Sequence, residues 1–347
     1  MGISEEGDGA ALSVVEFATV RPAGYHGGMT PRRPVLLSCL LGLACGSSNA
    51  SPSPAPAASS AAVTSDSGAS PRESEAGIAP AAGCPHAKAP VVAARVEAAE
   101  VDEASGIVAS ATNADVFWVH NDSGDTARAF AVTRAGKLAA TLALEGTTAI
   151  DIEDIAIEDA GGQSFLYLAD IGDNASRRAE VVIYRVAEPK LAGGAAQRLS
   201  AKPDVMRVTY PDGPHDAETL LFDPVTKDLL LATKRLFGGA VVHRVGPFAA
   251  GTKVTTTAIA TVPVAFATGG DISRDGRMIA IRSYGDAASL WTRAPGEGLA
   301  AALERTPCTV PLATETQGEA FGFLADGRGY ITVAEGRSPE LHLALFE

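Results

Sequence analysis

The stretch Asp151-Ile-Glu153-Asp154-Ile-Ala156 is one copy of an element that occurs five times in the chain. In each copy a small or acidic residue precedes an aliphatic strand, a turn and a second strand with a polar end. The other copies read Glu103-Ala-Ser-Gly106, Asp216-Ala-Glu218-Thr219, Thr268-Gly-Gly-Asp271 and Thr316-Gln-Gly-Glu319. We take Gly106, Asp154, Thr219, Asp271 and Glu319 as equivalent positions, which gives spacings of 48, 65, 52 and 48 residues. The longest spacing indicates an insertion around residues 188–202.

Between these copies the chain reads as short strands separated by Gly, Asp, Asn and Pro. Examples are residues 116–119, 165–168, 181–186, 229–232 and 330–333. The sequence indicates no amphipathic helix, only turns within residues 190–200. Units of about 50 residues with four short strands each are typical of β-propeller blades. We therefore predict an all-β propeller over residues 89–347, with five four-stranded blades as the simplest count and six as the alternative.

The end of the chain predicts how the ring closes. The last unit, residues 318–347, holds only three strands, so residues 91–96 are expected to supply its missing outer strand. Cys84 precedes this strand, and Cys308 falls in the neighbouring outer strand or the loop after it. A disulfide between the two cysteines would lock the closure, and two unpaired buried cysteines are the alternative. No Cys-x-x-Cys motif occurs, so a structural zinc site is not expected.

The first 88 residues predict an export signal followed by a flexible spacer. Residues 1–28 show no hydrophobic period, which indicates an upstream extension with Met29 as the true start. Residues 29–44 combine two arginines, a short apolar run and small residues before Cys45, as in a lipoprotein export signal. We expect lipidation of Cys45 and membrane attachment through that lipid alone; simple secretion and a buried strand are the alternatives. Residues 45–88 are expected to be a flexible tether, because 30 of the 38 residues from 46 to 83 are Ala, Ser, Pro or Gly.

Charge and missing motifs exclude several functions. The chain has 28 Lys and Arg against 41 Asp and Glu, and its net charge of -13 disfavours nucleic-acid binding. It contains no Gly-x-Ser-x-Gly elbow, no phosphate-binding Gly-Lys-Ser/Thr loop and no Gly-x-Gly-x-x-Gly. We therefore expect no organic cofactor, and a monomer that binds a ligand or protein of the bacterial cell envelope.

The recurring acids predict a metal site. In a propeller the first strand of each blade lines the central channel, so residues at the strand starts meet at one mouth. Carboxylates gathered in this way need bound protons or a cation, and oxygen ligands favour Ca²⁺ or Mg²⁺ over zinc. The alternative is that these acids bind backbone amides or arginines. The candidate ligands are Glu103, Asp151, Glu153, Asp154, Asp216, Glu218, Asp271 and Glu319.

Three functional classes stay open on these residues. The first is binding of a ligand or partner at an acidic, calcium-loaded mouth. The second is metal-assisted hydrolysis of a phosphoester or carboxylic ester, and the third is a structural interaction module without metal. Hydrolysis would use Glu153, Asp154, Asp216 and Glu218 as ligands or base, His120 and His215 for acid–base work, and Lys234 or Arg282 to stabilise developing charge.

Four strings also carry a resemblance. They are His120-Asn-Asp-Ser-Gly-Asp125, Asp151-Ile-Glu-Asp-Ile-Ala156, Asp170-Ile-Gly-Asp-Asn174 and Tyr210-Pro-Asp-Gly-Pro-His-Asp-Ala-Glu218. Together they resemble the signature strings of a group of secreted bacterial propeller-like proteins with no assigned activity, over roughly residues 100–340. The architecture is similar, at the level of the fold, to NHL, TolB-like and esterase-like phytase propellers. The resemblance implies a propeller and an exported protein, and a shared fold does not transfer an activity.

Overall fold

The computed structural model describes residues 13–14 and 83–347. The predicted upstream extension and export signal, lipidation of Cys45 and the tether as far as residue 82 lie outside the described residues, apart from the short strand at 13–14. The folded ring begins earlier than the sequence predicted. Residues 84–88, expected to belong to the tether, contact the end of the chain: Ala87 forms a β-bridge with Phe346, and Lys88 donates its amide to the Leu345 carbonyl at 2.9 Å. Within the described part, no helix combines the length and the hydrophobicity needed to cross a bilayer.

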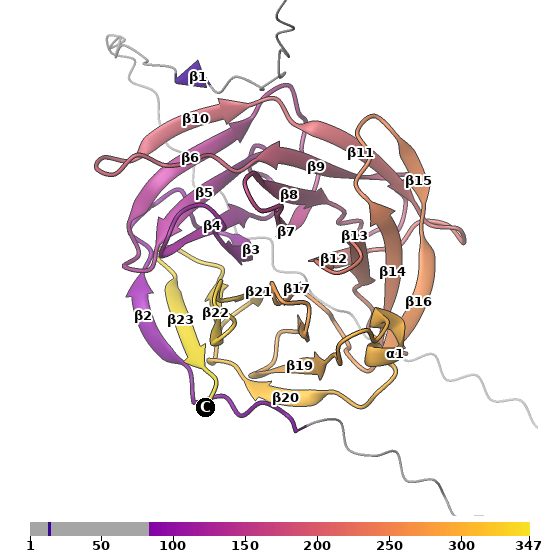
Figure 1. The fold of residues 1–347 in the computed structure, drawn as a ribbon. Helices are drawn as coiled ribbons and strands as arrows, with labels where there is room; N and C mark the ends of the chain where they lie inside the picture. Colours follow the sequence, from indigo (N-terminus) through magenta and orange to yellow (C-terminus); the bar gives the residue numbers. More distant parts are fainter. Residues whose placement is uncertain (1–12, 15–82) are drawn as a thin grey trace, which may run out of the picture. The chain divides into compact units, whose positions relative to one another are not determined.

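Five antiparallel blades surround a central axis, with β3, β7, β12, β17 and β21 innermost (Figure 1). This arrangement confirms the predicted five-bladed, all-β propeller. Blade 1 holds β3 (Ala104–Ala109), β4 (Val116–Asn121), β5 (Arg128–Thr133) and β6 (Leu138–Leu144). Blade 2 holds β7 (Ile152–Asp159), β8 (Ser164–Asp170), β9 (Val181–Ala187) and β11 (Asp204–Thr209). Blade 3 holds β12 (Ala217–Phe222), β13 (Asp228–Thr233), β14 (Ala240–Pro247) and β16 (Thr257–Val262).

The last two blades confirm the predicted closure. Blade 4 holds β17 (Gly269–Ile272), β18 (Met278–Arg282), β19 (Ala287–Thr292) and β20 (Cys308–Pro311). Blade 5 holds β21 (Gly318–Phe323), β22 (Gly329–Ala334) and β23 (Glu340–Leu345), and its outer strand is β2 (Val91–Arg95) from the start of the domain. β2 pairs with β23 antiparallel, and the two strands lie side by side in Figure 1. The predicted disulfide joins Cys84 to Cys308, with 5.6 Å between their Cα atoms.

Three short strands extend the outer edges of blades 1 and 2. β10 (Gln197–Ala201) lies in the predicted insertion and pairs parallel with β6, and β1 (Ser13–Val14) pairs with β10. β15 (Lys253–Thr255) leaves blade 3 and pairs parallel with β11 of blade 2. The sequence also missed α1 (Leu299–Leu303), a five-residue helix in the connection between β19 and β20. These additions lie at the outside of the ring and leave the channel to the inner strands.

The hydrophobic core lies between the blades. Five separate clusters of buried side chains occupy the five gaps between neighbouring blades. Trp118 of blade 1, for example, belongs to the same cluster as Leu168 of blade 2, and Ile107 of blade 1 to that of Ile331 of blade 5. Burial of this apolar area holds each blade to the next, at about 25 cal/mol per Å².

At two positions the structure does not support the equivalences that we assigned from the spacing of the repeats. In blades 1, 2, 3 and 5 a bulge falls on the second residue of the inner strand, and the residue after it pairs with the second strand. The residues after the bulge are Gly106, Asp154, Thr219 and Ala320, so Ala320 takes the place assigned to Glu319. Counted from the hairpin turn, Asp271 is equivalent to Leu221 and Gly322, not to Asp154. Bulges and strand register, which a spacing does not reveal, account for these shifts.

Candidate functional site

The bulge directs three glutamates to one end of the channel. The bulged residue is Ser105 in blade 1 and a glutamate in the three other bulged blades: Glu153, Glu218 and Glu319. A β-bulge changes the direction of the side chain that it carries, and bulges are common next to functional sites. The glutamate carboxylates are close enough that the charges of Glu218 and Glu319 both raise the pKa of Glu153.

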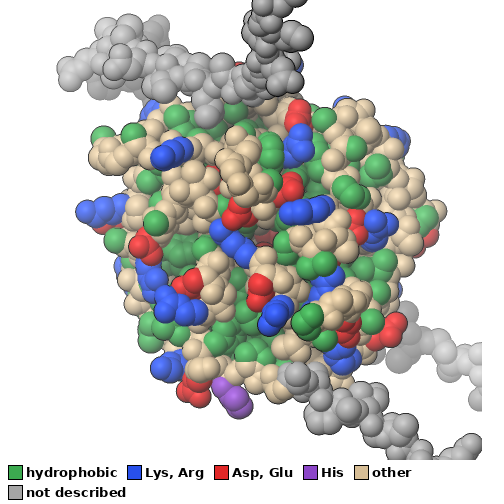
Figure 2. All heavy atoms as spheres, viewed as in Figure 1, with side chains coloured by type: hydrophobic (Ala, Val, Ile, Leu, Met, Phe, Trp, Pro, Cys, Tyr) green, Lys and Arg blue, Asp and Glu red, His purple; other side chains and the backbone are tan. Residues whose placement is uncertain are grey.

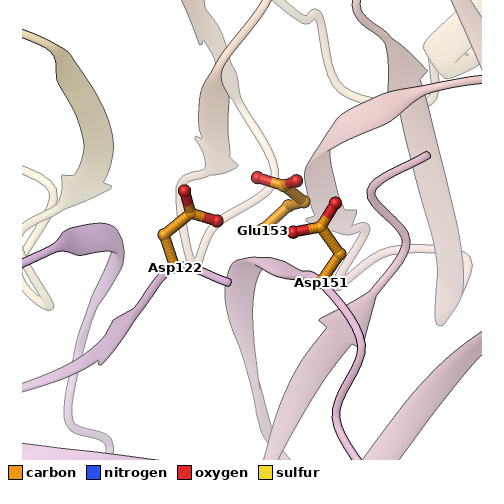
Figure 3. A group of neighbouring side chains, drawn as sticks. All are labelled: Asp122, Asp151 and Glu153. Atoms are coloured by element: carbon orange, nitrogen blue, oxygen red, sulfur yellow. The ribbon is translucent and has the colours of Figure 1, made fainter. Parts of the chain in front are cut away.

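Asp122, Asp151 and Glu153 form the first acidic group. One carboxylate oxygen from each of them lies within 4.8 Å of the others, and the three side chains point toward one another in Figure 3. Asp122 follows β4 and donates its amide to the Glu103 carbonyl at 2.8 Å. Asp151 precedes β7, and its amide donates to Asp170 Oδ1 at 3.1 Å. Strand ends of two neighbouring blades therefore build the group.

Gly172 makes the space for two of these carboxylates. A Cβ atom at this position would lie 2.1 Å from Glu153 Oε1 and 2.4 Å from Asp151 Oδ2. No other residue type leaves that volume free. Gly172 lies in the predicted string 170–174, and its neighbours also support the site: Asp170 accepts the Asp151 amide, and Asp173 donates its amide to Asp216.

Asp122, Glu319 and Glu335 form the second acidic group, again with one oxygen from each within 4.8 Å of the others. Glu335 follows β22 and donates its amide to the Gln317 carbonyl at 3.3 Å. Asp122 therefore belongs to both groups. Neither Asp122 nor Glu335 was among the predicted ligands. Both lie at the end of a second strand, and that shared position was the signal in the sequence that could have found them.

These five carboxylates have no protein cation beside them. In the described residues, no Lys, Arg or His nitrogen lies within 4.0 Å of a carboxylate oxygen of Asp122, Asp151, Glu153, Glu319 or Glu335. Lys234, which follows β13, pairs instead with Glu218 and donates to the Tyr284 hydroxyl at 2.8 Å. The Tyr284 hydroxyl in turn donates to Glu319 Oε1 at 3.1 Å.

Burial and mutual repulsion raise the pKa values of the whole group. Burial, followed by the charges of Glu218 and Asp122, raises the pKa of Glu153 to about 11. Burial is also the main cause that raises the pKa of Asp151 to about 6, of Glu335 to about 7 and of Glu218 to about 8. The pKa values of Asp122 and Glu319 rise for the same reason. The groups must therefore hold protons at neutral pH or be neutralised by a cation.

The donor atoms fit a hard cation. Asp122 Oδ1, Glu218 Oε2 and Glu319 Oε2 are buried and have no hydrogen-bond partner in the described part of the chain. A buried unpaired polar atom costs about 1–3 kcal/mol, and more if it is charged. Several carboxylate oxygens without nitrogen or sulfur ligands are the set that Ca²⁺ and Mg²⁺ prefer. The two acidic groups can thus hold a metal ion.

Two predicted ligands have a structural role instead. Asp154 accepts the amide of Ile155 on one oxygen and, on the other, the Leu220 amide of blade 3, both at 2.8 Å. Asp271 does the same with Ile272 and with Phe323 of blade 5, also at 2.8 Å. Both oxygens of each carboxylate accept backbone amides and so join neighbouring inner strands. Neither residue belongs to an acidic group. For these two residues the structural alternative holds.

The other predicted ligands border the site. Glu218 faces Lys234, as described above. Asp216 accepts the Asp173 amide at 2.8 Å, and burial raises its pKa. Glu103 is exposed and lies outside both groups. Of the eight predicted ligands, three belong to an acidic group, namely Asp151, Glu153 and Glu319.

The predicted catalytic side chains are not assembled around the acids. His120 is fully buried, its Nδ1 lies 2.9 Å from the Asn121 carbonyl, and burial lowers its pKa to about 4. His215 Nε2 lies 2.8 Å from Asp212 Oδ1, and the His215 ring packs edge-on against Tyr210. Arg282 is buried and pairs with Glu315 at 2.8 Å, so it is not free to clamp an anion. Of the groups predicted for hydrolysis, Glu153, Glu218 and Lys234 lie at the mouth.

Exposed apolar side chains lie in loops of blades 3 and 4, after β13, before β17 and after β18. Phe237, the most exposed of the large hydrophobic residues at 79%, lies with Leu236 in the loop after β13. Phe266 precedes β17, and its amide donates to the Arg235 carbonyl at 2.9 Å, which joins the two loops. Tyr284 follows β18 and contacts Lys234 through its hydroxyl and its ring. We call Leu236, Phe237, Phe266 and Tyr284 the apolar rim. Apolar and charged side chains alternate over the ring surface in Figure 2.

The comparisons with known proteins add no family. No protein-family model matches this chain, and a search of the curated proteins finds no match.

Proposed function

We propose that this propeller is a binding module that holds calcium at the acidic mouth of its channel and uses it to bind a ligand or partner of the cell envelope. One observation carries the proposal: Asp122, Asp151 and Glu153 bring oxygens within 4.8 Å of one another, and within residues 83–347 no Lys, Arg or His nitrogen lies within 4.0 Å of these carboxylates. Leaving three carboxylates together without a counter-charge is costly in a buried site, and a divalent ion removes that cost.

Calcium fits the predicted location better than magnesium. The export signal and lipidation at Cys45 predict a protein outside the cytoplasm, where calcium-binding modules have a Kd of roughly 10⁻⁴ to 10⁻³ M. Calcium also accepts six to eight irregular oxygen ligands, whereas Mg²⁺ requires a near-ideal octahedron at about 2.0–2.1 Å. Carboxylates supplied by several blades favour the more permissive ion.

The apolar rim supports binding in preference to hydrolysis. Exposed apolar side chains next to a polar centre are typical of interaction sites. Two of the groups expected to perform hydrolysis are engaged elsewhere, since Asp154 binds backbone amides and Arg282 pairs with Glu315. We therefore place the ligand over the mouth, with its polar part at the calcium and its apolar part on Phe237 and Phe266.

Calcium titration of the full chain tests this function. We expect isothermal titration calorimetry to detect calcium binding at neutral pH with a Kd on the order of 10⁻⁴ M. Calcium should also raise the melting temperature, and chelator should reverse the rise. Glu153→Gln should weaken binding at least tenfold, whereas Glu304→Gln, at an exposed acid that ends α1, should leave it unchanged. A metal-free protein whose melting ignores calcium and chelator contradicts the proposal.

The predicted anchor has its own test. Radiolabelled palmitate should be incorporated into the full chain expressed in a bacterial host, and Cys45→Ser should abolish the labelling. Labelling that persists in Cys45→Ser would show that Cys45 is not the lipidated residue.

A further inference from the structure

We infer that the mouth holds two cations side by side, bridged by Asp122, with Asp151 and Glu153 completing one position and Glu319 and Glu335 the other. This inference rests on the proposed cation binding and goes beyond it in number and arrangement. A mouth with one ion binds one calcium per chain, whereas a bridged pair binds two. The stoichiometry therefore tests the pair separately from calcium binding itself.

The carboxylates divide into two sets that share one residue. Among the described residues, the acids that approach within 4.8 Å form the set of Asp122, Asp151 and Glu153 and the set of Asp122, Glu319 and Glu335. The five do not form one set within this limit. An aspartate has two oxygens and can give one to each of two ions, and ions bridged in this way lie about 3.5–4 Å apart. Asp122 is the only residue that occurs in both sets.

Each set contains a deeply buried carboxylate with a free oxygen. Glu153 is 3% exposed and has neither a hydrogen-bond donor nor a cation beside it in the described residues. Glu319 is 4% exposed; its Oε1 accepts the Tyr284 hydroxyl, and its buried Oε2 has no partner. The bridging residue adds a second fully buried oxygen without a hydrogen-bond partner in the described residues, Asp122 Oδ1. A single ion in the first set would leave Glu319 Oε2 unsatisfied.

Charge balance favours a second ion when the carboxylates of both sets are ionised. The two sets together carry five carboxylates, and Lys234, which lies at the mouth, is already paired with Glu218. When all five are ionised, one divalent ion leaves three negative charges uncompensated, and two ions leave one. The bridging carboxylate between the ions offsets their mutual repulsion, as in proteins with two-metal sites.

Calcium stoichiometry of the full chain tests the pair. We expect equilibrium dialysis with radioactive calcium to give two ions per chain. Asp151→Asn and Glu335→Gln should each keep one ion, and Asp122→Asn should weaken both at least tenfold. Glu304→Gln, at the exposed acid that ends α1, is the matched control and should keep two. Circular dichroism of each variant shows whether it is folded, and a variant that does not fold is replaced by Glu153→Gln or Glu319→Gln, which remove one ligand of the same position.

Manganese supplies an independent readout of the bridge. Two equivalents of Mn²⁺ in the wild-type chain should give the electron paramagnetic resonance signal of a spin-coupled pair, and Asp151→Asn should give that of an isolated ion. One ion per wild-type chain, lost in both Asp151→Asn and Glu335→Gln, overturns the pair but leaves the proposed function intact. Two ions that survive Asp122→Asn overturn the bridge. No bound ion overturns both proposals.

Discussion

At the scale of single residues, the site depends on one glycine and on the buried glutamate beside it. Gly172 carries no side chain where the carboxylates of Asp151 and Glu153 meet. Glu153 lies in surroundings so poor in water and so rich in negative charge that its pKa rises to about 11. Each residue gives a prediction.

Gly172→Ala should impair calcium binding without unfolding the protein. The new Cβ would lie 2.1 Å from Glu153 Oε1 and 2.4 Å from Asp151 Oδ2, and both side-chain ends would have to move away. We expect calorimetry to show at least a tenfold weaker calcium affinity, which is about 1.4 kcal/mol. Gly162→Ala is the control, because a Cβ at Gly162 meets no atom within 4 Å. Equal affinities in the two variants would contradict this account of the site.

The metal-free protein should lose stability as the pH rises from 7 to 9. In this range the folded state keeps a proton on Glu153, whose pKa is about 11, whereas the unfolded chain has released it near the ordinary value of 4.5. The folded state therefore binds more protons, and each additional bound proton lowers the free energy of unfolding by about 1.4 kcal/mol per pH unit. Glu218 and Glu335, with pKa values of about 8 and 7, act in the same direction at the lower end of the range.

Urea unfolding in chelator at pH 7, 8 and 9 measures this loss. Saturating calcium should flatten the dependence, because the ion replaces the protons, and Glu153→Gln should flatten it without calcium. The buried histidines do not disturb the measurement. The pKa of His120 is lowered to about 4, so both the folded and the unfolded state are largely deprotonated at this residue above pH 7. A stability that rises over this range would refute the assigned protonation.

At the scale of elements, the inner strands combine two functions in adjacent residues. Along β7, Glu153 lies on the bulge and faces the mouth, and Asp154 crosses to β12 of blade 3. β17 repeats the second of these features, since Asp271 crosses to β21 of blade 5. Acids that look alike in the sequence therefore serve either cation binding or the joining of blades.

Asp154→Ala should destabilise the protein without changing its calcium stoichiometry. The substitution leaves the buried amides of Ile155 and Leu220 without an acceptor, and each costs about 1–3 kcal/mol. We expect the free energy of unfolding in urea to fall by about 2–6 kcal/mol. Glu103→Ala, at an exposed acid, should change it by less than about 0.5 kcal/mol. Loss of bound calcium in a folded Asp154→Ala protein would show that Asp154 is a ligand after all.

At the scale of the whole molecule, the ring is closed by segments from opposite ends of the domain. β2 completes blade 5, and the Cys84–Cys308 disulfide ties the segment before β2 to β20 of blade 4. The bond spans 224 residues of sequence, so it restricts the unfolded chain strongly. It lies on the outer strands, away from the inner strands that carry the acids.

Reduction of the disulfide should lower stability and spare calcium binding. We expect the free energy of unfolding to fall by about 2–4 kcal/mol, seen as a lower melting temperature in reductant. Calcium stoichiometry below the melting temperature should stay the same, because no ligand lies on the outer strands. The double variant Cys84→Ser/Cys308→Ser should behave like the reduced protein and should not respond to reductant. A melting temperature that reductant does not change would mean that the bond does not form in solution.

The sequence by itself determined the propeller and its closing strand, and it favoured five blades over six and a Cys84–Cys308 disulfide over two unpaired cysteines. These follow from local apolar patterns and their spacing, which each unit carries within about 50 residues. Only the tertiary structure decided which acids meet. Successive side chains in a strand point to opposite faces. A bulge or a shift of one position therefore turns a side chain from the channel toward the neighbouring blade. For that reason Glu153 faces the mouth while Asp154 joins two blades, and Asp122 and Glu335 meet there from strand ends more than 200 residues apart in the sequence.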